Sequence, residues 1–107
     1  IDPNNPVHVG HAVRVAEELG ADLVKTNYTG DPESFAKIVK ASSIPVLIAG
    51  GEKGEDIDTY RTIYDAVHFA KCAGVCMGRN AFQRDNVAKF VSNVSQVVHQ
   101  GARPETL

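Results

Sequence analysis

Hydrophobic positions recur every three or four residues in four segments of the chain, a spacing that predicts amphipathic helices. The first segment ends before Gly20 and has its apolar side chains at Val9, Ala12, Val13, Ala16 and Leu19. The second begins at "DPE", where Asp31 suits the N-cap and Pro32 the first helical position. The third is the long segment 56–72, and the last has its apolar positions at Val87, Phe90, Val91, Val94 and Val98.

Three short apolar runs lie between these predicted helices. The first covers residues 21–24 and leads directly into Lys25, the second is "IPVLIAGG" (44–51), and the third is "AGVCMGRN" (73–80). None alternates apolar with polar residues, and each is followed by a helix, which is typical of parallel strands covered by helices. The predicted fold class is therefore α/β, in the order α-βα-βα-βα with right-handed crossovers. The tail 101–107 is expected to be a frayed end.

Parallel βα units occur both in doubly wound sheets and in TIM (β/α)8 barrels. A full barrel needs at least about 200 residues, whereas this chain has 107. In a barrel it would supply only part of the ring, namely three βα units. In both architectures the loops at the carboxyl ends of the strands form the functional site. We therefore expect Lys25, the pair Gly50–Gly51 and the pair Gly78–Arg79 along one rim of the sheet.

Composition and charge exclude several kinds of partner. Charged residues make up 22% of the chain and the formal net charge is -2, so no basic surface for nucleic acid or an anionic membrane is expected. No apolar run approaches the roughly 18 residues that span a bilayer. Cys72 and Cys76 lack a second pair to complete a zinc site, and their context is apolar. We expect both to be reduced core thiols in a cytoplasmic protein.

Glycines at the ends of the second and third apolar runs indicate an anion site. Gly50 and Gly51 allow a ligand to approach the main chain closely. Gly78 is followed by Arg79 and a helix start, and helix N-terminal amides beside a guanidinium group bind anions. Each could also be an ordinary tight turn. Two such turns on adjacent strands, one of them with an arginine, favour binding of a phosphate group.

Lys25 is the candidate nucleophile. Strand alternation places Leu23, Lys25 and Asn27 on one face of the sheet and Val24 and Thr26 on the other. At a strand end inside a closed sheet the amine is expected to be partly desolvated and near the arginine of the third strand. Both effects lower the pKa of an amine and increase the neutral fraction that attacks a carbonyl. The alternative is a lysine that extends its amine past the strand end into solvent.

The segments "GADLVKTNYTGD", "PVLIAGG" and "GVCMGRNAFQRD" resemble, in this order and spacing, the last three strands of the archaeal-type class I fructose-bisphosphate aldolases. That family belongs to a wider group with a transaldolase-like synthase of aromatic amino-acid synthesis and a thiolase acting on a phosphorylated quorum signal. The resemblance covers nearly the whole chain. It implies that residues 1–107 are the C-terminal portion of a single (β/α)8 aldolase domain.

The resemblance also implies a chemistry. The family's Schiff-base lysine falls on Lys25, and its phosphate-binding positions fall on Ala49, Gly50, Gly51, Gly78 and Arg79. Lys25 would attack a ketose carbonyl, and the iminium ion would accept the electrons of the adjacent C–C bond, without a metal or other cofactor. The implied function is a class I aldolase of glycolysis and gluconeogenesis acting on fructose 1,6-bisphosphate, or the related synthase or thiolase. The family's acid/base aspartate and tyrosine come from strands outside this chain, so Tyr28 is not given that role.

Several other side chains receive structural interpretations. His8 and His11 are three positions apart and are expected to be a solvated pair rather than metal ligands. Tyr60 and Tyr64 lie on the apolar stripe of their helix and are expected in the core. Lys53 follows the double glycine and is either a mobile surface lysine or a further contact to a substrate phosphate.

Unpaired strand edges suggest how the chain associates. The first and third strands would leave their edges open unless another chain or the rest of a barrel covers them, so we expect a homo-oligomer. A function of another class, a non-catalytic α/β module that binds a phosphorylated ligand, is also compatible with the pattern. The expected small-molecule partner is a sugar phosphate in either case.

Overall fold

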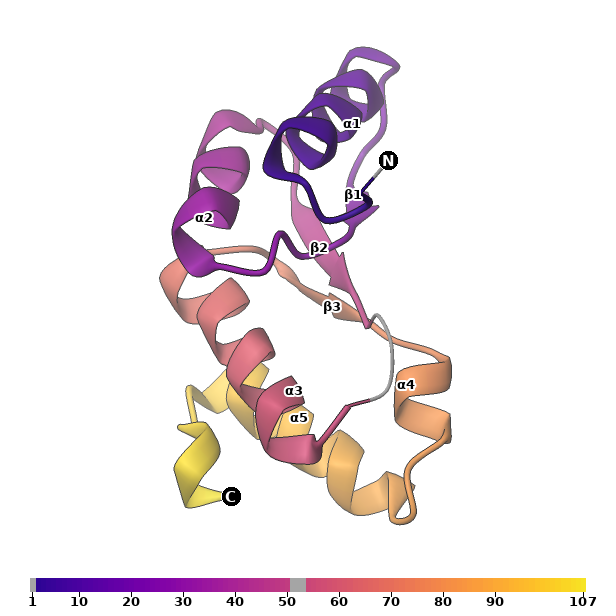
Figure 1. Cartoon of the computed structure of the whole chain (residues 1–107), viewed down its shortest axis with the longest axis vertical. Helices are drawn as coiled ribbons and strands as arrows, with labels where there is room; N and C mark the ends of the chain where they lie inside the picture. Colours follow the sequence, from indigo (N-terminus) through magenta and orange to yellow (C-terminus); the bar gives the residue numbers. More distant parts are fainter. Residues whose placement is uncertain (1, 51–53) are drawn as a thin grey trace.

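The computed structural model describes residues 2–50 and 54–107 (Figure 1). The three strands are separated by helices in the predicted order, which confirms the α/β fold class, and β3 is followed by two helices, the short α4 and α5. Their bounds are α1 Pro6–Glu18, β1 Val24–Thr26, α2 Pro32–Ala41, β2 Val46–Ala49, α3 Asp56–Tyr64, the π-helix η1 Asp65–Phe69, β3 Gly74–Cys76, α4 Arg79–Phe82, α5 Val87–Gln100 and the 3-10 helix η2 Pro104–Thr106.

The strands form a parallel sheet in the order β1-β2-β3. Lys25 pairs with Leu47, which in turn pairs with Gly74, while Ala49 pairs with Cys76. Because registered positions of parallel strands point to the same side, these residues share one face, which we call the open face. The side chain of Lys25 and that of Cys76 are exposed there, and Leu47 and Ala49 are half-buried.

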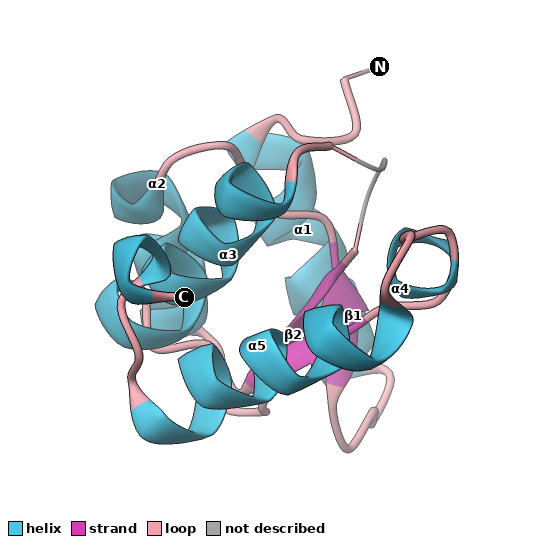
Figure 2. Cartoon of the chain, turned by 90° about the horizontal axis from the view of Figure 1, so that it is seen from below, coloured by secondary structure: helices cyan, strands magenta, loops and turns pink. Residues whose placement is uncertain are grey.

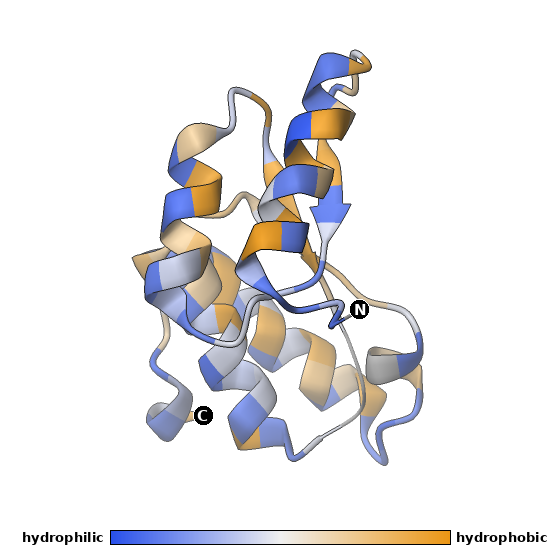
Figure 3. Cartoon of the chain, turned by 45° about the horizontal axis from the view of Figure 1, so that its top comes forward, coloured by the Kyte–Doolittle hydropathy of each residue, from blue (hydrophilic) through white to orange (hydrophobic). Residues whose placement is uncertain are grey.

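The opposite face of the sheet is covered by helices. Val46 and Ile48 point to this side and are buried in the hydrophobic core, and Val24 and Val75 pack against that core. In both views α2 and α3 lie on one side of the sheet, and α4 lies on the other, next to the end of β3 (Figures 1 and 2). The helices carry alternating hydrophobic and hydrophilic bands, as expected for amphipathic helices with one buried side (Figure 3). The core therefore lies between the sheet and its helices.

Local capping explains where the main helices begin and end. Asp31 accepts a hydrogen bond from the backbone N–H of Ser34 at 2.8 Å, which confirms it as the N-cap of α2. This bond, together with that from the Ser34 hydroxyl, holds the pKa of the Asp31 carboxyl below its ordinary value. Asn86 caps α5 in the same way, by accepting from the N–H of Lys89 at 3.0 Å. Gly101 ends α5 with φ +66°, a left-handed conformation that suits glycine.

Three details of the predicted elements are wrong. The first strand is Val24–Thr26 rather than residues 21–24, so Lys25 is its central residue. The third helix is not α-helical throughout, because η1 replaces its last part with π-helical turns in which Ala70 N–H donates to the Asp65 carbonyl at 2.9 Å. The tail is not frayed, since η2 buries Pro104.

Candidate active site

Lys25 projects from the middle of β1 on the open face of the sheet, as strand alternation predicted. The expected desolvation is wrong for this chain, because the sheet has open edges and the Lys25 side chain is exposed. On the same face, the half-buried Leu47 and Ala49 of β2 lie beside it. The amine of Lys25 is therefore exposed beside a partly apolar surface.

The carboxyl ends of β2 and β3 bring the predicted phosphate positions to one edge of the sheet. Ala49 ends β2 opposite Cys76, the last residue of β3. Gly50 follows Ala49 directly, and Gly78 and the exposed Arg79 follow β3 at the start of α4. An added Cβ at Gly78 would meet no atom within 4 Å, so this turn has free space around it. Gly51 and Lys53 lie outside the described residues.

A cavity of about 200 Å³ lies at the end of β2. Ala49 and Gly50 line it from the strand, Gly54 from the following connection, and Thr59 and Thr62 from α3. Backbone amides and hydroxyl groups of this kind can bind phosphate oxygens. The carboxylate of Asp58 also lines the cavity and opposes an anion there. The cavity thus places polar groups and open space beside two of the predicted phosphate positions.

Tyr28 lies on the helix-covered side and not with Lys25 on the open face. Its ring packs edge-on against Phe35, with 5.2 Å between the ring centroids, and it contacts the hydrophobic core. Burial, with a smaller effect of the negative charges of Asp65 and Asp31, raises the pKa of Tyr28 to about 12. This placement agrees with leaving Tyr28 out of the acid/base roles.

The raised pKa of Tyr28 makes stability depend on pH. The folded state holds the phenol protonated better than the unfolded state, whose tyrosine pKa is about 10. The resulting stabilisation is complete below about pH 10 and is lost as the pH rises toward a pKa of about 12 in the folded state. We expect Tyr28→Phe to flatten this part of the pH profile of the free energy of unfolding. An unchanged alkaline slope in this variant, measured by denaturant titration, would contradict the assignment.

The remaining predicted positions divide between confirmed and wrong. His8 and His11 are exposed, as expected for a solvated pair, and Tyr60 is buried. Cys72 is buried, and its burial raises the pKa of its thiol. Cys76 is exposed, so its prediction as a core thiol is wrong. Cys76 is the last residue of β3 and lies on the open face of the sheet, where its side chain is exposed.

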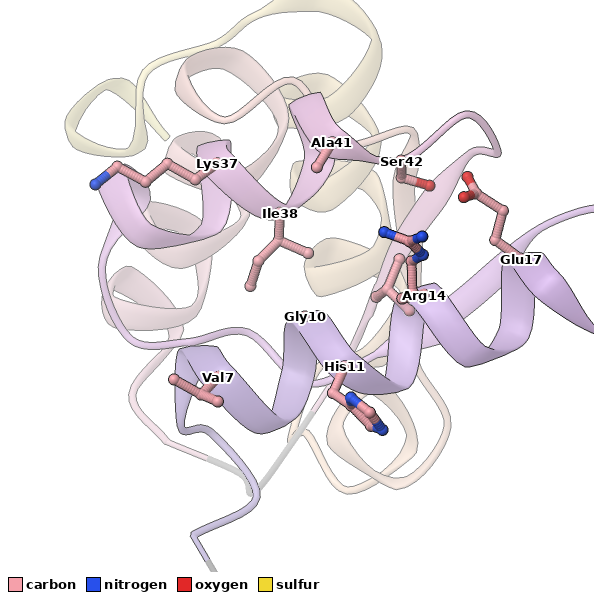
Figure 4. A pocket seen from close by; sticks show the side chains of 10 residues that line it. Val7, Gly10, His11, Arg14, Glu17, Lys37, Ile38, Ala41 and Ser42 are labelled. Atoms are coloured by element: carbon pink, nitrogen blue, oxygen red, sulfur yellow. The ribbon is translucent and has the colours of Figure 1, made fainter.

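A second cavity, of about 430 Å³, lies between α1 and α2 (Figure 4). Val7, Gly10 and Ile38 supply its apolar walls, and Arg14 and Glu17 lie at one end. None of the predicted site residues that the structure describes lines this cavity. It is a gap between neighbouring helices and is separate from the strand ends.

Sequence reasoning missed Arg84, which lies between α4 and α5. Its side chain is buried and donates hydrogen bonds to Gly54, Asp56 and Thr59 in the segment that follows β2. The partners precede it by 25 to 30 positions, so no local pattern indicates the contact. Arg84 therefore joins the connections after the second and third strands.

Comparisons with known proteins show the family of this chain. Residues 2–84 match the DeoC/LacD family aldolase, and the chain belongs to this family. A 2-amino-3,7-dideoxy-D-threo-hept-6-ulosonate synthase from Halobacterium salinarum is 45% identical over 105 residues, which are 98% of this chain and 39% of the synthase. The resemblance to a Schiff-base aldolase family, predicted from the strand motifs, is confirmed.

Two solved structures show the fold to which this chain belongs. The crystal structure of an archaeal fructose 1,6-bisphosphate aldolase matches 94% of this chain and 40% of its own chain, with a TM-score of 0.90 and 37% identity. Another archaeal fructose-1,6-bisphosphate aldolase, with its catalytic lysine covalently bound to the carbinolamine intermediate of the substrate, matches 92% of this chain and 39% of its own, with a TM-score of 0.88 and 35% identity. The three parallel strands and their helices are thus part of a TIM-barrel aldolase fold, as predicted.

The chain spans about two fifths of the length of these relatives, since it covers 39% of the synthase and 40% of the first aldolase. Within residues 2–50 and 54–107, no helix has the length and apolarity to cross a membrane. In the same described part, no three His, Cys, Asp or Glu side chains gather closely enough to hold a metal ion.

Proposed function

We propose that Lys25 is the Schiff-base lysine of a class I aldolase-type enzyme whose substrate is a phosphorylated ketose. The observation that carries this proposal is the position of Lys25, which is central on β1 and exposed on the open face of the sheet. It is supported by membership of the aldolase family and by the similarity to an archaeal aldolase with a lysine-bound carbinolamine. We further propose that the chain is the C-terminal portion of one (β/α)8 domain.

The chemistry follows from a primary amine facing a ketone. The neutral amine of Lys25 attacks the carbonyl carbon and forms a carbinolamine, which loses water to give an iminium ion. A base then takes the proton of the β-hydroxyl, and the bond between the α and β carbons breaks, so that the β carbon leaves as an aldehyde. The electron pair of this bond forms the C=C bond of an enamine, and the π electrons of the C=N bond return to nitrogen. Protonation of the enamine carbon and hydrolysis release the ketone product and the free lysine. The acid and base for these steps are proposed to come from strands outside this chain.

The phosphate of the substrate is proposed to bind at the ends of β2 and β3. Ala49 and Gly50 would supply backbone groups from one strand end, and Gly78 and Arg79 would supply an amide and a guanidinium from the next. The paired ends of the two strands support this arrangement. A ketose held there by its phosphate would extend across the open face toward Lys25.

We expect Arg79→Ala to weaken substrate binding without preventing imine formation. A hydrogen bond to a charged group is worth about 1.5–3 kcal/mol, so half-saturation for dihydroxyacetone phosphate should rise roughly 10- to 100-fold. The measurement is borohydride trapping as a function of ketone concentration in the full protein. Arg103→Ala, a change of another exposed arginine in the C-terminal tail, is the control and should leave half-saturation unchanged. An equal effect of both substitutions would contradict the phosphate role of Arg79.

Two whole reactions are candidates for this site. The strand motifs led us to propose cleavage of fructose 1,6-bisphosphate, and the archaeal aldolase structures, at 37% and 35% identity, support it. The second candidate is a synthase reaction, which the 45% identity to the Halobacterium salinarum synthase favours. Both are compatible with imine formation at Lys25, so the site geometry alone does not separate them.

Two assays test the proposal in order. Borohydride treatment with dihydroxyacetone phosphate, followed by peptide mass spectrometry, should place the adduct on Lys25, and EDTA should not prevent it. Release of triose phosphates from fructose 1,6-bisphosphate then identifies the aldolase. Trapping without that cleavage favours the synthase. A folded, phosphate-binding protein that gives no adduct would contradict imine chemistry and favour a non-catalytic binding module.

A further inference from the structure

Arg84 is a charged residue inside the core region of the described chain. Its side chain is 3% exposed, whereas that of its carboxylate partner Asp56 is 57% exposed. The guanidinium carbon lies 4.3 Å from the centroid of the Phe90 ring, which covers one side of it. A buried charge is expensive unless all its donors are bonded, so such a residue marks a place where geometry is held closely.

The donors of Arg84 reach the segment that follows β2. Nη1 donates to the Gly54 carbonyl at 2.6 Å and to Oδ1 of Asp56 at 2.7 Å, and Nη2 donates to Oγ1 of Thr59 at 3.1 Å. These acceptors are the end of the connection after β2 and the first turn of α3. The planar fork of the guanidinium therefore holds three acceptors of one segment in a fixed relation.

On its other side, Arg84 is tied by backbone bonds to the turn after β3. Gly78 accepts from the N–H groups of Ala81 and Phe82, at 2.9 and 3.1 Å. Ala81 in turn accepts from the N–H of Arg84 at 3.4 Å. The segment from Gly78 to Arg84 is thus a compact hydrogen-bonded unit that also contains Arg79.

We infer that Arg84 is a positioning residue for the substrate phosphate, an inference that rests on the proposed function. It holds Gly54 and the first turn of α3 against the segment from Gly78 to Arg84. The proposed phosphate position Gly50 lines one cavity with Gly54 and Thr59, and the positions Gly78 and Arg79 belong to the other segment. The side chain of Arg84 is 3% exposed and already donates to Gly54, Asp56 and Thr59, so we assign it to positioning and not to contact with the phosphate. Its role is to keep the two halves of the anion site at one separation, so that both contact the same phosphate group.

The test compares two ketones in the full protein, one with and one without a phosphate group. Arg84→Met removes the donors and keeps an apolar side chain over Phe90. We expect half-saturation for borohydride trapping with dihydroxyacetone phosphate to rise about tenfold, as when one hydrogen bond to a charged group is lost. Trapping with dihydroxyacetone should stay within about twofold of the parent, because that ketone makes no phosphate contact. If Arg84 had only a structural role, its loss would change half-saturation for both ketones to the same extent.

Arg61→Met is the matched control. Arg61 lies on α3 and forms a surface ion pair with Glu105, and its side chain is 56% exposed. Arg61→Met should leave half-saturation for trapping unchanged with both ketones. Equal losses for the two ketones in Arg84→Met, or no loss for either, would overturn the inference.

A second variant keeps the inference testable if Arg84→Met does not fold. Asp56→Asn weakens the bond from Arg84 to a side chain that is 57% exposed. It should raise half-saturation for dihydroxyacetone phosphate about twofold to fivefold, again without affecting half-saturation for dihydroxyacetone. An unchanged value for dihydroxyacetone phosphate would overturn the inference in that case.

Failure of the proposed function is detected separately. If the parent protein traps neither ketone, imine chemistry at Lys25 is wrong, and calorimetric titration with inorganic phosphate then decides about Arg84. The positioning role is supported if phosphate binds to the parent and binds more weakly to Arg84→Met. If Arg84→Met is unfolded, Asp56→Asn takes its place in this comparison. Absent or unchanged phosphate binding overturns it.

Discussion

Lys25→Ala should abolish borohydride trapping of dihydroxyacetone phosphate and reduce turnover by roughly 10³- to 10⁶-fold. Loss of the nucleophile removes the covalent pathway altogether, and single substitutions of a nucleophile have effects at the upper end of this range. The exposed amine at the centre of β1 is the group that we propose to attack the carbonyl. The measurement is adduct mass on the tryptic peptides together with the rate of ketose cleavage or synthesis in the full protein.

Lys25→Arg separates the charge of this residue from its nucleophilicity. Arginine keeps the positive charge at all accessible pH values but forms no imine with a ketone under these conditions. It should therefore be as inactive as Lys25→Ala while binding phosphate at least as well. Lys40→Ala, which removes an exposed lysine of α2, is the control and should remain active. Trapped substrate on another lysine in Lys25→Ala would assign the nucleophile elsewhere.

Much of the fold could be predicted because its signals are local. Apolar runs followed by amphipathic segments depend on spacings of a few residues, and they led to the correct order of helices and parallel strands. The cap at Asp31 is likewise a contact across three positions, with the N–H of Ser34. The face of Lys25 followed from strand alternation, which the register with Leu47 confirms.

Features that depend on distant contacts could not be predicted in the same way. The pattern of one strand does not reveal how the edges and faces of its sheet are covered, so the exposure of Lys25 and that of Cys76 were both misjudged. The π-helix at Asp65–Phe69 contains His68, whose Nε2 lies 2.5 Å from the Val97 carbonyl of α5, 29 positions away. The sequence of that segment shows only helical periodicity and does not indicate this contact with α5.

In the candidate site, too, some residues could be predicted from local patterns and others depend on distant contacts. Gly50, Gly78 and Arg79 were predictable as neighbours because parallel strands bring their carboxyl ends to one edge. The face of Lys25, the central residue of β1, was predictable because side chains alternate along a strand. Arg84 was not, because its acceptors lie in a separate segment of the sequence. The positions proposed to contact the ligand thus follow from topology, whereas the residue proposed to hold them in place is found only in the packed structure.

Phe35→Ala should lower the free energy of unfolding by about 3–5 kcal/mol, the range expected when a large aromatic side chain is removed from a core. Phe35 is 0% exposed on α2, and its ring packs edge-on against Tyr28. Tyr28 belongs to the loop that follows β1, so the cavity would lie directly behind the strand that carries Lys25. Loss of this support should shift both the denaturation midpoint and the trapping rate at Lys25.

Phe82→Ala makes the same chemical change at a side chain that is 74% exposed, and it should cost less than about 0.5 kcal/mol. Urea titration of the two variants in parallel measures the difference directly. Because many domains have only about 5–15 kcal/mol of stability in total, the Phe35 variant should also have a measurable unfolded fraction at lower denaturant. Equal midpoints for the two variants would contradict the stabilising role assigned to the buried Phe35 side chain.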